Sequence, residues 1–461
     1  MARTSAAYIC TTCERTLLQW AGRCPHCGAW NALEASRRSR EATSGGGEAV
    51  SLRLVTGGTE PPMSTGIGEV DRVLGGGFVA GSATLVYGPP GVGKSTLLFQ
   101  VLSSVASMGT DVLLASAEES LVQVSGRAGR IGDVPERLLA LEGHDVVAIE
   151  TAIDRHRPSL VVVDSIQSIS DDEVPGAAGS LLQVKACVER LTRLAKSSGV
   201  PIVLVGHVTK DGDLAGPRAI EHLVDTVLSF DGDRHHAVRV LTAIKHRFGP
   251  SGEVGIFEMR ESGLRAVPDP GRLLLGDRLT DVSGSVVVPV LQGRRPLLVE
   301  VQALVAHTAT GGRPRALGVD ASRVALLMAV LEARAERPMI GRDVFIAAVG
   351  GINVTEPAAD LAIALALASA ANDQPVHFDL VAFGELGLAG ELRMVPGADR
   401  RLSEAQRAGF TNAIVPASTP DEAIPPGMRV HRVRTLFEAV RVFFSDITDT
   451  MPPWLTEAAS R

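Results

Sequence analysis

The stretch GPPGVGKS, at residues 88–95, constrains the fold of this chain more than any other part of its sequence. It follows the apolar run SATLVY and precedes the helix-like run TLLFQVLSSVASMG. A strand, a glycine-rich loop and a helix in this order are typical of the phosphate-binding loop of nucleoside triphosphatases. The glycines let backbone N–H groups close around phosphate oxygens at a helix N-terminus. The residues expected to bind ATP are Gly88, Pro89, Pro90, Gly91, Val92, Gly93, Lys94, Ser95 and Thr96.

Three side chains predict how the nucleotide and its metal ion are held. Lys94 is placed to reach the outer phosphates, and the Ser95 hydroxyl is placed to ligate Mg²⁺. The apolar run SLVVVDS, at residues 159–165, ends in Asp164. This is the carboxylate expected to hold the same ion through water. The sequence therefore predicts a site for ATP with Mg²⁺.

Four apolar runs after the loop predict the sheet that carries it. They are DVLLASA (111–117), SLVVVDS (159–165), VPIVLVGH (200–207) and HAVRVLTAIK (236–245). Continuous runs that alternate with helices favour a mostly parallel sheet covered by helices on both faces, which is an α/β fold. An open sheet of this class binds its ligand at the carboxyl ends of its strands. The polar residues at those ends are Glu118, Glu119, His207 and Lys245.

The carboxylates that follow the run 111–117 are candidates for catalysis. Hydrolysis needs a carboxylate that orients the attacking water. Glu118 or Glu119 is placed for that role, and the alternative is a pair of surface carboxylates that begin a helix. His207 is either a sensor of the γ-phosphate or an ordinary histidine at a strand end.

Two cysteine pairs near the N-terminus, CTTC and CPHC, predict a metal site. Two C-x2-C turns this close together place four thiolates around one tetrahedral zinc ion. A segment of about 30 residues cannot build an adequate core, so the metal would supply its folding energy. A closed four-sulfur site has no open position for catalysis. The expected ligands are Cys10, Cys13, Cys24 and Cys27.

Other cysteine and histidine chemistry has plainer interpretations. Disulfides are the alternative for the four cysteines, but a cytoplasmic setting disfavours them. His26 is expected to be a bystander, and Cys187, alone in a helical stretch, a reduced core thiol.

The overall composition places the chain in a broad class. Its 461 residues suffice for two or three domains, and 45% hydrophobic with 21% charged residues is ordinary for a soluble globular protein. The apolar run LAIALALASAA is too short to span a bilayer, and no secretory signal begins the chain. We therefore expect a cytoplasmic protein. A net charge of −7 argues against a uniformly basic nucleic-acid coat but leaves a local basic track possible.

The order of these pieces resembles the RecA-like ATPases and, among them, the bacterial RadA (Sms) family of DNA repair proteins. The resemblance covers nearly the whole chain and includes a C-terminal part that resembles the Lon protease domain. The matching stretches are CTTC…CPHC, GPPGVGKST, SAEES, VVVDSIQS, GHVTKDGDLAGPRAIEHLVDTVLSFDGD and KHRFG. The expected organisation is a zinc finger (1–35), a linker (36–60), a RecA-like ATPase domain (61–265) and an α+β Lon-like domain (270–450).

The resemblance implies a function. Such proteins are DNA-dependent ATPases of homologous recombination and repair that bind single-stranded and branched DNA. They drive branch migration with the RecA recombinase and form a hexameric ring. By position, Glu118 matches the family's catalytic glutamate and Asp164 its Walker B aspartate. The segments 170–180 and 211–217 match two DNA-facing loops, and their glycines fit mobile loops that order on a ligand.

The stretch KHRFG, at residues 245–249, matches a family signature that usually reads KNRFG, so His246 stands where the family has asparagine. Lys245 and Arg247 are retained. By resemblance they reach a neighbour's nucleotide or the DNA, as an arginine finger does. Without the resemblance, the two cations would be an ordinary surface pair.

The Lon-like part lacks the residues that cut peptide bonds. Lon-type proteolysis needs a serine nucleophile and a lysine base. Ala358 stands at the serine position and Asp399 at the lysine position. We expect a fold retained without its chemistry, used to pack subunits and to present basic residues to DNA. The candidates for phosphate contact, each with a solvated charge as the alternative, are Arg37, Arg38, Arg40, Arg313 and Arg315.

Three hypotheses remain from the sequence. The first is a DNA-dependent motor, the second an ATP-dependent protease, and the third a zinc-bearing regulatory ATPase that binds a protein partner. Residues 358 and 399 argue against the second. ATP turnover with and without single-stranded DNA separates the first from the third.

Overall fold

The computed structural model describes residues 8–13, 15–17, 20–35, 61–207, 219–232, 238–280, 282–307, 314–339, 341–375 and 377–444. The chain divides into two compact units, residues 1–59 and 60–461, which are described separately. Among the sequence-predicted features, the basic residues of the linker, Arg313 and the loop 211–217 lie outside the described residues.

The N-terminal unit is a small antiparallel sheet. Its strands are β1 (Tyr8–Cys10), β2 (Thr16–Leu17) and β3 (Leu33–Ala35), in the order β2-β1-β3. The buried cluster in the described part of this unit is only Cys10, Cys24 and Ala32. A core this small cannot offset the entropy lost on folding, so the unit needs a further stabilising element.

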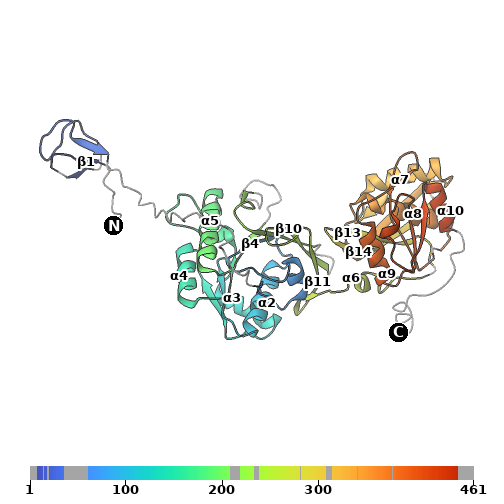
Figure 1. Ribbon diagram of the computed structural model, residues 1–461, viewed down its shortest axis with the longest axis horizontal. Coiled ribbons are helices and arrows are strands. Elements are labelled where there is room, and N and C mark those ends of the chain that lie inside the picture. Colours follow the sequence, from blue (N-terminus) through green and yellow to red (C-terminus); the bar gives the residue numbers. More distant parts are fainter. Residues whose placement is uncertain are drawn as a thin grey trace. The chain divides into compact units, whose positions relative to one another are not determined.

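The second unit contains a nine-stranded sheet in the order β12-β11-β10-β9-β4-β8-β7-β5-β6. Figure 1 labels its strands β4, β10 and β11. Six strands of the sheet pair in parallel. They are β4 (Ala83–Gly88), β5 (Val112–Ser116), β6 (Leu138–Glu142), β7 (Leu160–Asp164), β8 (Ile202–His207) and β9 (Thr226–Asp231). The predicted, mostly parallel sheet is therefore confirmed.

Helices cover both faces of this sheet. One apolar cluster joins one face to α1 (Gly68–Val73), α2 (Lys94–Ser107) and α3 (Leu121–Ile131). A second cluster joins the other face to α4 (Val146–His156) and α5 (Leu181–Ser198). β5 and β7 are buried along their whole length, which explains their continuous apolar sequence.

The predicted strand at residues 236–245 runs in the opposite direction to the parallel strands. Lys245, at its end, was expected beside the other polar strand ends, and this expectation is wrong. The strand corresponds to β10 (Val238–His246), which is antiparallel to β9 and to β11 (Val254–Arg260). β12 (Gly263–Ala266) completes this antiparallel extension. Only residues 232–237 connect β9 to β10, too few for the crossover that parallel strands require. β10 therefore ends at the edge where the parallel strands begin, with His246 opposite Thr226.

The C-terminal part has an α+β architecture built on a mixed seven-stranded sheet in the order β15-β16-β14-β13-β17-β20-β21. The strands are β13 (Ser285–Gln292), β14 (Arg295–His307), β15 (Arg315–Leu317), β16 (Arg342–Ala348), β17 (Leu380–Ala382), β20 (Asn412–Pro416) and β21 (Arg429–Val433). A separate hairpin pairs β18 (Glu385–Leu386) with β19 (Leu392–Arg393). The helices are α6 (Pro270–Leu275), α7 (Ala321–Arg334), α8 (Asp360–Asn372), α9 (Ala398–Arg407) and α10 (Leu436–Phe443).

Helix α8 is the apolar run noted in the sequence. Its residues 360–369 are all buried, as predicted for a core helix. Among the helices that the structure describes, none combines the length and the apolar character needed to cross a membrane.

A buried ion pair joins the nine-stranded sheet to the C-terminal part. Glu69, 2% exposed at the start of α1, accepts a hydrogen bond from Ile256 N at 2.9 Å and one from the guanidinium of Arg295. Arg295 lies at the start of β14 and also donates to Pro268 O at 2.9 Å. The two parts also share an apolar core, to which Val254 and Ile256 contribute. The ion pair therefore lies beside a continuous hydrophobic contact.

We predict that Arg295→Ala lowers the free energy of unfolding by about 3–5 kcal/mol, because it leaves the Glu69 carboxylate buried without a partner. Urea unfolding followed by circular dichroism measures the change. The matched control is Arg294→Ala, whose side chain is largely exposed and lies 3.4 Å from Glu253. This control should change stability by less than about 1 kcal/mol. Equal losses in the two variants would contradict the prediction.

Candidate nucleotide site and zinc module

The phosphate-binding loop lies between β4 and α2, as predicted. Gly91 and Gly93 have φ angles of 76° and 110°, which residues with a Cβ rarely adopt. A Cβ at Gly88 would lie 2.0 Å from Phe230 O, so this position also requires glycine. The glycines thus permit a compact turn that ends at the N-terminus of α2, where backbone N–H groups favour an anion.

Lys94 is folded into this loop. Its Nζ donates to Gly88 O at 2.9 Å and to Pro89 O at 3.1 Å, and lies 3.1 Å from His207 Nδ1. Burial lowers the pKa of Lys94, and the charges of Asp164 and Glu118 oppose that shift. The carbonyl oxygens of Gly88 and Pro89 therefore hold the Lys94 ammonium at the loop, next to His207 at the end of β8.

Asp164, at the end of β7, is in contact with Ser95 in the first turn of α2. Burial raises the pKa of Asp164, and a hydrogen bond from the Ser95 side chain lowers it. Ligand atoms of Glu118, Asp164 and His207 lie within 4.8 Å of one another. Carboxylate and hydroxyl oxygens suit Mg²⁺, whereas imidazole does not. The donor set therefore fits Mg²⁺ at Asp164 and Ser95, with His207 outside it.

Glu118 belongs to the same cluster. Its Oε1 lies 3.4 Å from His207 Nε2 and accepts hydrogen bonds from the hydroxyls of Ser165 and, at 3.3 Å, Ser168. The nearby His207, followed by the hydroxyl of Ser165, lowers the pKa of Glu118 to about 2. The carboxylate is therefore charged at neutral pH and can orient a water molecule.

Glu119 is directed away from this cluster. Its carboxylate lies 3.0 Å from the guanidinium of Arg127, and its backbone oxygen accepts from Ser116 Oγ at 2.6 Å. Of the two carboxylates at this strand end, the structure therefore brings Glu118 to the nucleotide loop.

Lys245 and Arg247 are not assembled with these residues. Lys245 Nζ donates to the backbone oxygens of Glu221 and Val224 at 2.7 and 2.8 Å. Arg247 pairs with the buried Asp225 at 2.9 Å. Because β10 is antiparallel, both cations lie at the edge of the sheet opposite the loop of their own chain.

His246, which lies between Lys245 and Arg247 in the sequence, forms two polar contacts. Its Nε2 lies 3.1 Å from Leu74 O and its Nδ1 lies 2.9 Å from Thr226 Oγ1. A carbonyl oxygen only accepts, so Nε2 carries the proton and Nδ1 accepts from the threonine. Burial lowers the pKa of His246, which favours this neutral form.

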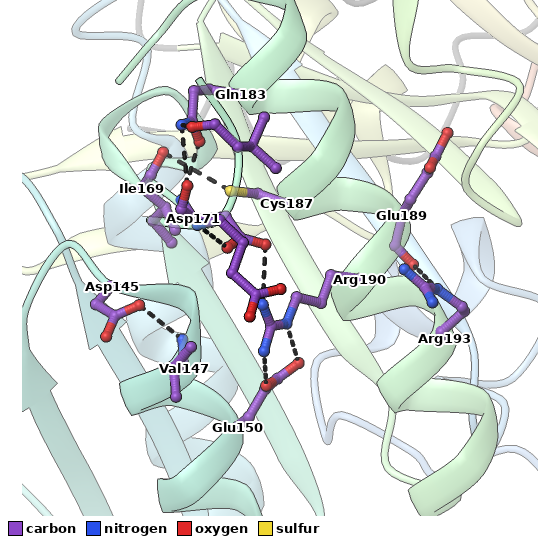
Figure 2. A network of polar contacts seen from close by, with 12 residues as sticks. Asp145, Val147, Glu150, Ile169, Asp171, Gln183, Cys187, Glu189, Arg190 and Arg193 are labelled. Carbon is purple, nitrogen blue, oxygen red and sulfur yellow. Dashed lines mark hydrogen bonds and ion pairs between the residues drawn. The ribbon is translucent and has the colours of Figure 1, made fainter. Parts of the chain in front are cut away.

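The first loop expected to be mobile, residues 170–180, is held in its first half. The buried side chain of Gln183 accepts from Asp171 N at 2.9 Å and donates to Val174 O at 2.6 Å (Figure 2). The same amide also donates to Gly176 O at 3.3 Å, so Gln183 binds backbone from Asp171 to Gly176. That the loop orders on a ligand stays a prediction.

The four N-terminal cysteines converge. Cys10 Sγ lies 3.7 Å from Cys27 Sγ, and Cys13 Sγ lies 3.8 Å from Cys24 Sγ. Sulfurs bound to one tetrahedral zinc at about 2.3 Å are about 3.8 Å apart, whereas a disulfide needs about 2.05 Å. All four are free thiols, so the geometry fits zinc. His26 is exposed and lies outside the cluster.

Cys187 is the buried core thiol that the sequence predicts. Its Sγ lies 3.9 Å from Ile169 O, and burial raises its pKa to about 11. A thiol with this pKa is a poor nucleophile at neutral pH.

The two positions that correspond to the protease residues differ in their surroundings. Ala358 is buried in the turn Pro357–Ala359 that precedes α8. Asp399 is exposed in the first turn of α9. Arg315, on the edge strand β15, has its guanidinium 5.4 Å from the centre of the Phe345 ring.

Comparison with known proteins gives matches along the whole chain. Family models match at residues 64–213 (AAA domain), 8–35 (rubredoxin metal binding domain) and 349–419 (subunit ChlI of Mg-chelatase). The DNA repair proteins RadA of Mycobacterium tuberculosis (strain ATCC 25618 / H37Rv) and Bacillus subtilis (strain 168) are 45% and 43% identical. These alignments cover 97% and 96% of this chain, and 95% and 99% of the relatives. A crystal structure of the RadB recombinase is 26% identical and covers 44% of this chain and 99% of its own, with a TM-score of 0.36.

We predict that the purified protein carries about one zinc per chain and that Cys24→Ser loses it, because three thiolates leave the tetrahedral site open. Elemental analysis by mass spectrometry measures the metal content. Cys187→Ser, which removes the thiol far from these ligands in sequence, is the control and should keep its zinc. Full zinc content in the Cys24→Ser variant would contradict the four-thiolate site.

Proposed function

The chain belongs to the RadA family of DNA repair proteins, and on that premise we propose that it binds single-stranded DNA and drives branch migration of recombination intermediates together with the RecA recombinase. The coarser assignment is an ATP-hydrolysing enzyme of DNA repair and recombination that uses ATP with Mg²⁺ and carries Zn²⁺. The convergence of Lys94, Asp164 and Glu118 at one edge of the sheet supports ATP hydrolysis. The similarity to DNA repair proteins over nearly the whole chain supports its use on DNA.

The residues of this cluster divide the work of hydrolysis between them. Lys94 would bind the outer phosphates of ATP, and Ser95 and Asp164 would hold Mg²⁺, which would neutralise charge on the phosphates. The carboxylate of Glu118 orients the attacking water. Contacts with Ser165 and His207 hold this carboxylate in position. The pKa of about 2 makes Glu118 better suited to orient and polarise water than to remove its proton.

A neighbouring subunit completes this site. Lys245 and Arg247 lie at the opposite edge of their own sheet, where they cannot reach their own nucleotide loop. In a head-to-tail ring, that edge of one subunit faces the nucleotide loop of the next. A hexameric ring with these cations acting on the neighbour's nucleotide or on DNA accounts for their position, as an arginine finger supplied in trans does.

The C-terminal domain, residues 270–450, serves as a scaffold for the ring and contributes Arg315 to DNA contact. Ala358 cannot act as a nucleophile and Asp399 cannot replace a lysine base, which supports a domain without protease activity. In the zinc finger, residues 1–35, the reducing conditions of the cytoplasm keep the four thiols from forming disulfides.

We predict that Lys94→Ala abolishes ATP hydrolysis and branch migration, because the ammonium that binds the outer phosphates is lost. A coupled ATP-turnover assay, with and without single-stranded DNA, measures the first, and a strand-exchange intermediate with a labelled strand measures the second. DNA should raise the turnover of the unmodified protein, in a manner that weakens with salt. Full DNA-stimulated turnover in the variant would defeat the assignment, and an unmodified protein indifferent to DNA would favour a partner-binding ATPase.

The neighbouring glutamates form a matched pair for a second prediction. Glu118→Gln should lower kcat by a factor on the order of 100 or more, the range expected for loss of a group that activates water. Glu119→Gln should change kcat by less than about twofold, because the Glu119 carboxylate pairs with Arg127 and is directed away from the cluster of Glu118, Asp164 and His207. Steady-state ATP turnover distinguishes them. If Glu119→Gln is the inactive variant, the role of Glu118 is wrong.

A further inference from the structure

The carboxylate of Glu118 is held through a single oxygen. The Ser165 and Ser168 hydroxyls both donate to Oε1, and His207 lies 3.4 Å from the same atom. Among the described residues, no contact uses Oε2, which leaves that oxygen for a water molecule. Two of the three groups come from the segment that follows β7, so the position of this segment sets the direction of the carboxylate.

This segment is fixed first by the chain that leads into α4. His144 Nδ1 lies 3.1 Å from Ser168 O, and Ser170 N donates to His144 O at 2.7 Å. Val146 N in turn donates to Ser170 O at 3.1 Å. The backbone on both sides of Ile169, which is itself fully buried, is therefore pinned to a neighbouring element.

Gln183, 2% exposed on α5, fixes the next part of the segment (Figure 2). Its side-chain amide donates to Asp171 O at 3.1 Å and Val174 O at 2.6 Å. Its Oε1 accepts from Asp171 N at 2.9 Å. A buried amide that satisfies both its donor and its acceptor groups specifies one backbone conformation.

Arg190, two turns further along α5, joins three elements (Figure 2). It binds both carboxylate oxygens of Glu150 on α4, at 2.7 and 2.8 Å. Its Nη1 donates to Asp171 Oδ2 at 2.9 Å. The planar guanidinium can bridge the two carboxylates in one geometry, which an ammonium cannot reproduce.

We propose that Ser165 and Ser168 are positioning residues for Glu118, and that Gln183 and Arg190 keep the segment that carries these serines in place. Residues 165–176 then link the carboxylate to the exposed tip of the loop 170–180. This inference rests on the proposed role of Glu118 in orienting water. It assigns a function to residues 183 and 190, which touch neither the nucleotide loop nor Glu118 themselves.

The first test separates positioning from fold. Ser168→Ala should lower kcat for ATP about tenfold, the size of one hydrogen bond to a charged group, with KM for ATP changed less than about twofold. Ser168→Thr keeps the hydroxyl and should recover most of the rate. An unchanged kcat in Ser168→Ala, or no recovery in Ser168→Thr, would overturn the assignment of Ser168.

The second test asks whether Arg190 acts through the same segment. Arg190→Lys should lower kcat about threefold, whereas Arg193→Lys, exposed on the same helix, should leave kcat unchanged. The double variant Ser168→Ala/Arg190→Lys should resemble Ser168→Ala, because residues that act through one path are not additive. A double variant about thirtyfold slower, or equal rates for Arg190→Lys and Arg193→Lys, would overturn the link.

Two controls keep the result interpretable. Thermal unfolding followed by circular dichroism tests whether each variant folds, and Glu150→Gln replaces Arg190→Lys in the cycle if the latter does not. Glu118→Gln is measured alongside. Turnover retained in Glu118→Gln refutes the proposed role of Glu118 in orienting water, on which this inference rests, whereas loss there with an unaffected Ser168→Ala refutes only this inference.

Discussion

The side-by-side order of β4, β8, β7 and β5 is the constraint on which the nucleotide site depends. Parallel strands end at the same edge, so this order brings the loop after β4 next to His207, Asp164 and Glu118 from three separate strand ends. Buried charge then needs partners, and Lys94 finds them in loop carbonyls and in the two carboxylates. The order of the strands thus sets the position of each group in the site.

The sequence was sufficient where a function depends on adjacent residues. The phosphate-binding loop, Asp164 after its apolar strand, and the paired cysteines carry their spacing within a few positions, so local reasoning located them. The direction of β10 cannot be predicted unless the run TVLSFD, which forms β9, is recognised as a strand and not only as part of the longer stretch that matches the family. Only when β9 is known does the short connection of residues 232–237 show that β10 cannot be parallel to it.

Gln183 and Arg190 show a different limit of prediction from the sequence. A glutamine and an arginine on an amphipathic helix are ordinary residues, and their partners lie 7 to 40 positions away. Likewise, the choice between Glu118 and Glu119 depends on which way two adjacent side chains point. Arg127 on the following helix pairs with Glu119, whereas Ser165, Ser168 and His207 hold Glu118. Ser165 and Ser168 gave a weak signal, since both follow Asp164 within four positions of a strand end. Contacts formed by the tertiary fold could not be derived from spacing.

The contact between Glu69 and Arg295 bears on how far the chain can be shortened. The side chains of Val254 and Ile256 belong to the ATPase sheet, yet they pack in the apolar cluster of the C-terminal part. A chain that stopped near residue 265 would expose Val254 and Ile256 to water, and Glu69 would lose the guanidinium of Arg295. The catalytic sheet is thus not an excisable module, because two of its buried apolar side chains and one buried carboxylate depend on residues that come after it.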